Sequence, residues 1–424
     1  MLPNSIKNKF HFLKALGAVF YYGYPARKLN IIGVTGTDGK TTTSTMIYHL
    51  LRKTGEKVAL VSTVAAYIGD VEISTGLHVT SPSPWFLQKF MKETLNKGCK
   101  YLVLETTSHG LAQHRLLGTN VAVAVLTNIT HEHLDYHKNY SKYFEAKSKL
   151  FRGVDVAILN KEDFSYIRMK KVLRPKTELI AYDRKTLKGK IRKAAEEKFP
   201  EPYNLLNATA SILLVQQLGV ENSNEIIKGI KSFSGVKGRM EEVKNDKGIK
   251  IIVDFAHTPK ALESVLSYLR KKKAKNKRLI TVFGCAGERD IEKRVAMGKI
   301  SGKLSDISVI TAEDPRHEDV NKIIEQIVEG MKIVKAKEFN FGDNLTNNRY
   351  FIRIPERGKA IHFAINKLAR RGDTVVVCGK GHEQSLAYGK IEYSWSERKA
   401  INRALSGKIL QTALGFVMIV LTND

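Results

Sequence analysis

One short segment carries the residue types that bind the phosphates of a nucleotide: Gly36, Thr37, Asp38, Gly39, Lys40 and Thr41. Glycines allow backbone N–H groups to face a phosphate, and the N-terminus of a following helix adds positive potential. Lys40 could neutralise phosphate charge, and the Thr41 hydroxyl could bind Mg²⁺. A strict phosphate loop has glycine where this chain has Val34, so a simple glycine turn stays open as an interpretation. The apolar run before the loop and the helical pattern after it favour nucleotide binding. We expect the residues that bind the nucleotide to include Thr42 as well.

A lysine occupies an apolar position further along the chain. Lys147 is four residues after Tyr143 and four before Phe151, inside the apolar stripe of a segment with helical periodicity. Burial favours the neutral amine, which can react with CO₂ to give a carbamate and so become an anionic metal ligand. A lysine at the edge of the stripe that extends its amine to solvent is the alternative.

A histidine-rich segment, residues 131–137, follows the strand-like run Val121–Leu126. Ligands of open parallel sheets bind at the carboxyl ends of strands, and Glu105 ends a neighbouring run in the same way. Glu105, His133 and a carbamate on Lys147 could therefore bind two Mg²⁺ ions, which prefer oxygen ligands. The His-x-His-x-Asp spacing also fits a zinc hydrolase, although a hydrolase needs no nucleotide, and a polar loop with chance histidines is a third interpretation.

Alternating strand-like and helix-like runs would position these residues. They predict an α/β protein with mostly parallel sheets, in which a central phosphate-loop domain precedes a Rossmann-like C-terminal domain. We expect a short amphipathic N-terminal segment at 1–29, the central ATP-binding domain at 30–238, the C-terminal domain at 239–406, and a tail of unassigned role at 407–424. The basic stretch between Lys170 and Lys198 reads as an irregular surface excursion.

Composition narrows the class of protein. The 424 residues include 43% hydrophobic and 26% charged residues, which excludes a disordered chain and a disulfide scaffold. The formal net charge of +28 favours anionic partners, although basic residues without interleaved aromatics argue against nucleic acid. Three distant cysteines and the absence of a ~20-residue apolar run predict a cytoplasmic protein. Residues 10–22 are a candidate for weak contact with a membrane surface.

The motifs together resemble the Mur ligases, and within that family the branch that adds the third amino acid of the peptidoglycan stem peptide. The resemblance extends from about residue 31 to residue 404 and depends on motifs in family order. They include Thr35-Gly36-Thr37-Asp38-Gly39-Lys40-Thr41, Thr80-Ser81-Pro82, Glu105-Thr106-Thr107-Ser108-His109, His133-Leu134-Asp135-Tyr136-His137, Ala146-Lys147-Ser148, Tyr203-Asn204-Leu205-Leu206-Asn207, Gly238-Arg239-Met240-Glu241, Asp254-Phe255-Ala256-His257, Glu313-Asp314-Pro315-Arg316 and Gly379-Lys380-Gly381-His382-Glu383.

The resemblance implies an ATP-dependent ligase that adds a diamino acid, such as diaminopimelate or lysine, to a UDP-N-acetylmuramoyl dipeptide through an acyl phosphate. It implies ATP and two Mg²⁺ as cofactors, a carbamylated Lys147, a monomer and no nucleic-acid partner. The implied nucleotide contacts, beyond the phosphate loop, are Asn204, Asn207, Arg239, Asp254 and His257. The implied contacts to the muramoyl peptide and the amino acid are Thr80, Ser81, Thr107, Gln113, Arg115, Arg289, Asp314, Arg316, Gly379 and Glu383.

The sequence departs from the family at two places. Only about thirty residues precede the phosphate loop, so we expect most of the family's uridine-binding domain to be absent. The family's amino-acid motif is Asp-Asn-Pro-Arg, whereas this chain has Glu313-Asp314-Pro315-Arg316. Arg316 could still pair with a substrate carboxylate, and Glu383 with a side-chain ammonium.

Two other functions remain alternatives. One is a ligase similar to folylpolyglutamate synthetase, and the other is a non-catalytic basic nucleotide- or nucleic-acid-binding protein.

Overall fold

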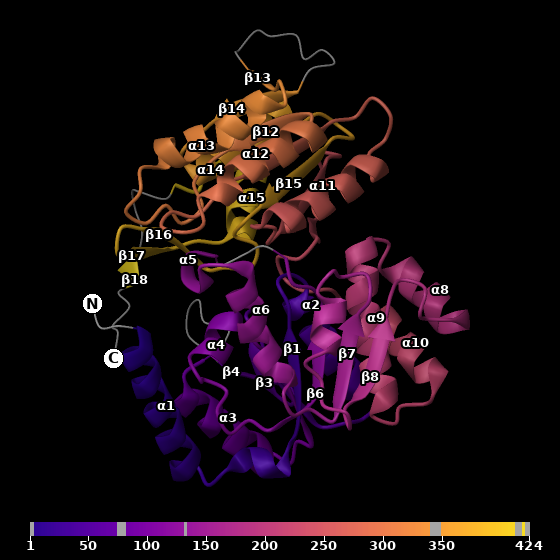
Figure 1. Cartoon of the computed structure of the whole chain (residues 1–424). Coiled ribbons are helices and arrows are strands. Elements are labelled where there is room, and N and C mark those ends of the chain that lie inside the picture. Colours follow the sequence, from indigo (N-terminus) through magenta and orange to yellow (C-terminus); the bar gives the residue numbers. More distant parts are fainter. Residues whose placement is uncertain (1–3, 74–81, 131–133, 340–348, 412–417, 420–424) are drawn as a thin grey trace. The chain divides into compact units, whose positions relative to one another are not determined.

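The computed structural model describes residues 4–73, 82–130, 134–339, 349–411 and 418–419. The chain divides into two compact units, Met1–Ser234 and Gly235–Asp424, four residues before the boundary predicted from the sequence. Each unit contains a mostly parallel sheet with helices packed against it, which confirms the predicted α/β fold (Figure 1).

The N-terminal unit contains an eight-stranded sheet in the order β4-β3-β2-β5-β1-β6-β7-β8. Its six central and C-terminal strands are parallel, and only the β2–β3 and β3–β4 pairs are antiparallel. The strands are β1 (Asn30–Thr35), β2 (Val58–Val61), β3 (Ala66–Ile68), β4 (Val71–Ile73), β5 (Tyr101–Glu105), β6 (Val121–Leu126), β7 (Val156–Asn160) and β8 (Glu178–Tyr182).

Helices of the N-terminal unit connect and cover these strands. The helix α3 packs on β1, β2 and β5, whereas α6 packs on β6 and β7, each through a buried apolar cluster. The helices are α1 (Asn4–Tyr21), α2 (Lys40–Lys53), α3 (Pro84–Asn96), α4 (Ser108–Ala112), α5 (Leu134–His137), α6 (Tyr140–Ser148), α7 (Tyr166–Lys170), α8 (Gly189–Lys198), α9 (Pro202–Gln217) and α10 (Ser223–Ser232), with a 3-10 helix at Pro25–Lys28.

The C-terminal unit contains a seven-stranded sheet in the order β13-β14-β12-β11-β15-β10-β9. All its strand pairs are parallel except that of β9 with β10. The strands are β9 (Glu241–Val243), β10 (Lys250–Asp254), β11 (Leu279–Phe283), β12 (Ile307–Ile310), β13 (Lys337–Glu338), β14 (Tyr350–Arg353) and β15 (Thr374–Cys378).

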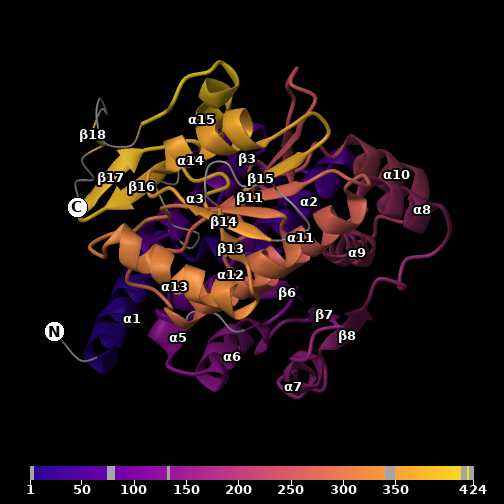
Figure 2. The ribbon, with the colours of Figure 1, turned by 90° about the horizontal axis from the view of Figure 1, so that it is seen from above.

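Two groups of helices cover this second sheet, one on each face (Figure 2). The first group packs through a buried cluster that includes Ile361 and Ile401 against Val253 and Val377. The first group is α14 (Arg357–Phe363) and α15 (Glu397–Leu405), and the second is α11 (Pro259–Lys272), α12 (Glu292–Leu304) and α13 (Val320–Ile333).

One prediction about local structure is wrong. The stretch from Lys170 to Lys198 is not an irregular excursion, because it contains β8, which pairs with β7, and the helix α8. Within the tail of unassigned role, β18 (Met418–Ile419) pairs with β17 (Ile391–Ser394), which also pairs with β16 (Ser385–Tyr388). On α1, part of the segment predicted to be amphipathic, Val19 is buried while Phe10, Leu13 and Phe20 are exposed.

Candidate active site

The phosphate loop connects β1 to α2 and turns sharply at two glycines. Gly39 has φ +81°, and a Cβ there would lie 2.4 Å from Oδ1 of Asn207. A Cβ at Gly36 would lie 1.8 Å from Oγ1 of Thr127. Larger residues at either position would therefore collide with the elements that enclose the loop.

Residues after β6 hold the loop from its other side. The backbone N–H of Asp38 donates to Oδ1 of Asn128 at 2.9 Å, and the Asp38 carbonyl accepts from Oγ1 of Thr127 at 2.6 Å. The N–H of Thr37 donates to the Asn128 carbonyl at 2.8 Å. Sequence reasoning missed Thr127 and Asn128 as supports for the loop, because they lie about ninety residues away and match no phosphate-binding pattern.

Lys40 rests on carbonyl oxygens of its own loop. Its Nζ donates to the carbonyls of Gly36 at 3.0 Å and Thr37 at 2.6 Å. In the part of the chain that the structure describes, Lys40 has no carboxylate partner. A phosphate could compete well for this ammonium group, because charge-assisted hydrogen bonds are stronger than bonds to neutral carbonyls.

Lys147 is buried against the same loop, with a relative exposure of 1%. The helix α6 begins after the Asn139 cap, whose Oδ1 accepts from the N–H of Lys142, and Lys147 lies in its last turn. Its Nζ donates to the Gly36 carbonyl at 2.5 Å and lies 4.7 Å from the centre of the Tyr143 ring. The Tyr143 hydroxyl in turn lies 3.1 Å from Oγ1 of Thr37.

Glu105 ends β5 and is almost fully buried. One of its oxygens accepts from the hydroxyls of Thr41 at 3.0 Å and Thr63 at 2.8 Å, and the other accepts from the Thr63 N–H at 2.9 Å. Sequence reasoning missed Thr63. Buried carboxylate and hydroxyl oxygens so close together are ligands suited to Mg²⁺. No group of three metal-binding side chains occurs among the described residues, which do not include His133.

The remaining predicted residues of the N-terminal unit lie in two further places. Thr42 is buried in the first turn of α2, while Asn207 accepts from the Thr43 hydroxyl and donates to Asn204 at 3.4 Å.

Thr107 caps α4, directly after the strand that ends at Glu105. Arg115 donates to Gln113 at 2.9 Å, and burial lowers the pKa of Arg115. Thr80 and Ser81 lie outside the described residues.

In the C-terminal unit, Arg239, Asp254 and His257 gather around Phe255. The Arg239 guanidinium lies 4.4 Å from the centre of the Phe255 ring. Asp254 accepts the N–H groups of Met240 at 2.7 Å and Ala256 at 2.8 Å, which fixes the chain on both sides of it. The His257 ring lies 4.5 Å from that of Phe255. The N–H of Gly379 donates to the Asp254 carbonyl, so the loop after β15 is attached to the same strand end.

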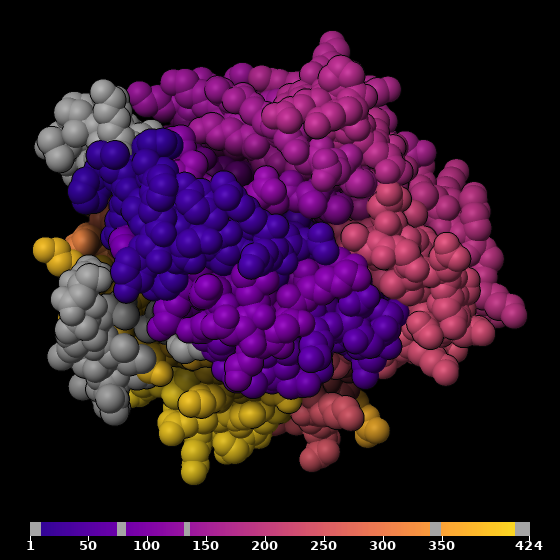
Figure 3. All heavy atoms as spheres, turned by 90° about the horizontal axis from the view of Figure 1, so that it is seen from below, coloured from indigo at the N-terminus to yellow at the C-terminus, as the bar shows by residue number. Residues whose placement is uncertain are grey.

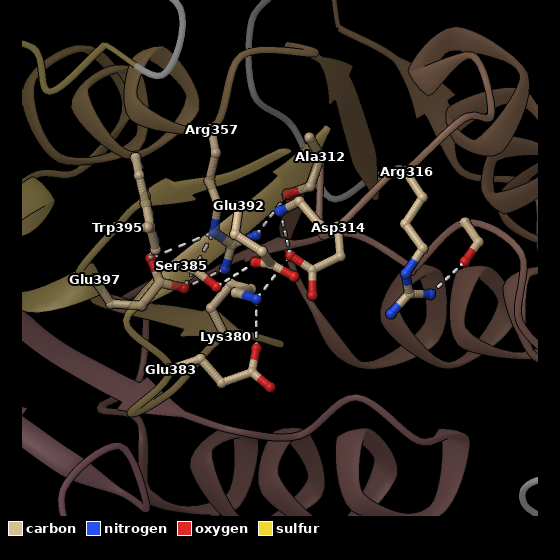
Figure 4. A network of polar contacts seen from close by, with 12 residues as sticks. Ala312, Asp314, Arg316, Arg357, Lys380, Glu383, Ser385, Glu392, Trp395 and Glu397 are labelled. Atoms are coloured by element: carbon tan, nitrogen blue, oxygen red, sulfur yellow. Dashed lines mark hydrogen bonds and ion pairs between the residues drawn. The ribbon is translucent and has the colours of Figure 1, made fainter. Parts of the chain in front are cut away.

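A buried lysine links two of the predicted amino-acid contacts (Figure 4). Nζ of Lys380 donates to Oδ1 of Asp314 at 2.8 Å and forms an ion pair with Glu383. Burial alone would lower the pKa of Lys380, but the carboxylates of Glu383 and Asp314 outweigh this effect and raise the pKa. Asp314 also accepts the N–H of Ala387 at 2.9 Å. The negative charge introduced by Asp314 is thus paired within the protein, a role that sequence reasoning did not assign to Lys380.

Arg316 differs from these paired groups. Its Nη1 donates to the Gly287 carbonyl at 2.7 Å, and among the described residues it has no carboxylate partner. Arg289, in the same region of the chain as Gly287, is exposed. Arg316 therefore keeps donors that could bind a carboxylate.

A second buried ion pair lies beside this network. Arg357 donates from Nε to Oε1 of Glu397 at 3.1 Å, from Nη1 to the carbonyl of Ala312 at 2.9 Å and from Nη2 to the carbonyl of Cys378 at 2.8 Å. The Trp395 indole N–H donates to Glu397. Both charged side chains are fully buried, so the pair connects the ends of β12 and β15 to α14 and α15.

Both units match known domains. Residues 34–222 match the Mur ligase middle domain, and residues 238–381 match the glutamate ligase domain of Mur ligases. The UDP-N-acetylmuramoyl-L-alanyl-D-glutamate--2,6-diaminopimelate ligase of Alkaliphilus metalliredigens is 38% identical over 408 residues, which cover 91% of this chain and 78% of that protein.

Solved structures agree with these matches. A structure of a ligase with the same name has a TM-score of 0.56 at 28% identity, covering 89% of this chain and 78% of that chain. The folylpolyglutamate synthase of Mycobacterium tuberculosis has a TM-score of 0.64, covering 87% of this chain and 92% of that chain, but at 14% identity it shows only a shared fold. Because two domains match and the 38% identical relative aligns over most of the length of both proteins, this chain belongs to the Mur ligase family.

Proposed function

We propose that the protein is an ATP-dependent ligase that joins a diamino acid to a muramoyl dipeptide through an acyl phosphate. The observation that carries this proposal is the convergence of Lys40 and buried Lys147 on the Gly36 carbonyl of the phosphate loop. The name of the 38% identical relative, a diaminopimelate ligase, supports diaminopimelate as the first amino acid to test.

The phosphate loop and Lys40 would bind the β- and γ-phosphates of ATP. Thr41 and Glu105, together with His133, are the proposed ligands for two Mg²⁺ ions. When bound, Mg²⁺ would reduce the repulsion between ATP and an anionic substrate. Asn204, Asn207, Arg239, Asp254 and His257 are proposed as further contacts to the nucleotide.

The reaction has two steps. A carboxylate of the dipeptide attacks the γ-phosphorus of ATP, the bond to ADP breaks, and an acyl phosphate forms. The amine of the incoming amino acid then attacks the acyl carbon, phosphate leaves, and the amine loses a proton as the amide forms. The contribution of the protein is mainly to position the reactants and to neutralise their charge.

Lys147 is the proposed site of a carbamate. The neutral amine would attack CO₂, forming an N–C bond and releasing one proton, and the product would be an anion with oxygen atoms that can bind Mg²⁺. The one remaining N–H could still donate to the Gly36 carbonyl, where Nζ donates now.

Further residues are proposed to bind the amino acid and the muramoyl peptide. Arg316, with a carbonyl as its partner, is the proposed contact for a carboxylate of the amino acid. Arg289, Asp314, Gly379 and Glu383 are proposed to complete that site. Thr80, Ser81, Thr107, Gln113 and Arg115 are proposed to bind the muramoyl peptide. We also propose that the protein is a monomer, which sedimentation would test.

A screen for phosphate release tests the activity. The full chain is incubated with ATP, Mg²⁺ and a muramoyl dipeptide, with or without the UDP group, and then with diaminopimelate, lysine or other amino acids. We expect release that depends on both the dipeptide and a diamino acid. Release with a folate and glutamate instead, or no release that depends on an amino acid, would overturn the proposal.

The carbamate has its own test. Lys147→Ala should lower the turnover of ATP about a hundredfold or more, because a metal ligand is lost. Short carboxylates such as acetate should restore part of the activity. Lys142→Ala, an exposed lysine on the same helix, is the matched control and should be unaffected. A Lys147→Ala variant with normal activity would disprove the carbamate.

A further inference from the structure

The helix α1 is apolar on two opposite sides. The fully buried residues of its described part are small, Ala15, Ala18 and Val19, which are at most 2% exposed, while Leu16 is only partly buried and Phe12 is 39% exposed. Four large apolar side chains face outward and are 62–73% exposed: Phe10, Leu13, Phe20 and Tyr21. A helix on the surface of a soluble domain normally has the opposite arrangement, with its large apolar residues buried and polar residues outside.

The outward residues form one continuous stripe. Their spacing from Phe10 is three, ten and eleven residues, which places them on one face of an α-helix. Gly17 lies in the middle of the stripe, and a Cβ there would be 4.0 Å from the Trp85 ring. The stripe thus continues across Gly17 onto the neighbouring helix.

That neighbour, α3, extends the apolar stripe and adds basic residues. Trp85 is 36% exposed, and the centre of its ring lies 5.4 Å from that of Tyr21 and 6.1 Å from that of Tyr22. Lys89 and Lys92, four and seven residues after Trp85, are exposed on the same side of α3.

Further basic residues follow the end of α1. Arg27 and Lys28 are exposed, and the Arg27 guanidinium lies 4.6 Å from the centre of the Tyr24 ring. In Figure 3, the indigo atoms of this N-terminal part of the chain lie open at the surface.

We propose that this face, defined here as the α1 face and formed by Phe10, Leu13, Lys14, Phe20, Tyr21, Arg27, Lys28 and Trp85, binds the surface of an anionic lipid bilayer. Large apolar residues, a Trp–Tyr cluster and a basic fringe are the features of helices that lie in the membrane interface. None of the described helices is long and apolar enough to cross a membrane, so the contact would be at the surface.

The charge of the helix favours a membrane over a second copy of the chain. The sequence of α1 contains three lysines and no acidic residue. Two such helices packed together would bring like charges close to one another, whereas anionic headgroups attract each basic residue near the surface. The proposal does not depend on the ligase activity, because it uses none of the residues proposed for ATP or substrates.

Vesicle binding tests the proposal directly. The full chain is mixed with vesicles of phosphatidylcholine alone or with phosphatidylglycerol added, and bound protein is measured by sedimentation. We expect binding only to the anionic vesicles, with a loss of about tenfold or more when Phe10, Leu13 and Phe20 are replaced by Ser. Lys14→Glu combined with Arg27→Glu and Lys28→Glu should also weaken binding.

The chain offers a matched control and a second readout. Phe164→Ser with Ile167→Ser removes two apolar side chains of similar exposure elsewhere in the same unit and should leave binding unchanged. Of the two tryptophans, Trp395 is buried, so a blue shift of fluorescence on vesicle addition would report Trp85. Equal binding to both kinds of vesicle, no loss in the triple Ser variant, or a dimer that this variant abolishes would each overturn the proposal.

Discussion

The cationic side chains near the candidate site have different hydrogen-bond partners in the two units. In the N-terminal unit, Lys40 and Lys147 near the phosphate loop donate to backbone carbonyls. In the C-terminal unit, Lys380 is neutralised by Asp314 and Glu383, and Arg357 by Glu397. Breaking a bond to a neutral carbonyl costs much less than separating a buried ion pair. Lys40 can therefore be released to a ligand, whereas the paired charges of the second unit serve to hold its loops.

Arg316 sharpens this contrast, because it lies beside the paired network but donates to a carbonyl. Its arrangement resembles that of Lys40 rather than that of Lys380. The type of hydrogen-bond partner, more than the type of residue, distinguishes a group that is available for substrate from a group that supports structure. Each prediction below tests one side of this difference.

The largest effect is expected on breaking the fully buried pair. Arg357→Met leaves Glu397 buried without a cation and should lower the free energy of unfolding of the C-terminal unit by about 3–5 kcal/mol. Urea unfolding measures the change. Arg398→Met, which removes an exposed arginine paired with Glu241, should cost about 1 kcal/mol or less. Similar losses in both variants would show that the buried pair has no special structural role.

Lys40→Ala should have a large effect on activity and a small effect on stability. We expect ATP turnover to fall about 100- to 1,000-fold, because a charge at the phosphates is lost. The free energy of unfolding should change by no more than about 0.5 kcal/mol, because only bonds to carbonyls are removed. Assays of phosphate release and thermal melting separate the two effects, and Lys53→Ala, at the exposed end of α2, serves as the control. A large loss of stability would remove the contrast between the units.

A smaller effect on stability, which depends on pH, is expected from the carboxyl group of Glu313, the residue before Asp314. It is buried, and its Oε2 has no hydrogen-bond partner among the described residues. Burial raises the pKa of Glu313 above its ordinary value of 4.5, although Lys293 and His257 partly oppose the shift. The unfolded chain therefore loses this proton first as pH rises, and the native state becomes relatively less stable.

Glu313→Gln should abolish that dependence. Below pH 4.5 the wild type and the variant should have similar pH profiles, whereas above it the wild type should lose stability relative to the variant, until the native pKa is passed. Unfolding in urea from pH 4 to pH 8 measures the difference between the two proteins. A difference that stays constant across this range would show that Glu313 has no raised pKa.

Several central strands and the parallel character of the sheets were accessible from the sequence because buried parallel strands are short apolar runs between helices. Residues 121–126 were predicted with their observed bounds. The strand β8 was missed because it lies at the edge of the sheet, is only partly buried, and lies among basic residues that suggest a loop. A membrane contact by residues 10–22 was anticipated, but which apolar residues of α1 face outward was not, since the sequence contains apolar residues on both sides of the helix.

The candidate site was predictable where its residues are adjacent in the chain. Strand, glycine loop, lysine and helix follow one another, so the loop could be recognised without the structure. Thr63, Asn128 and Lys380 could not be recognised, because their roles depend on contacts across 42 to 90 residues and their types are common. The pairing of Asp314 with Lys380 was likewise invisible in the motif.

The three cysteines, Cys99, Cys285 and Cys378, are all free and buried. Burial raises the pKa of each thiol, so the reactive thiolate is scarce in the native protein. Because Cys99 belongs to one unit and the other two belong to the other, a thiol-labelling reagent followed by peptide mapping would report the opening of each unit separately in the unmodified chain. The same burial makes the surface a clean background for a single introduced cysteine carrying a fluorophore or a spin label.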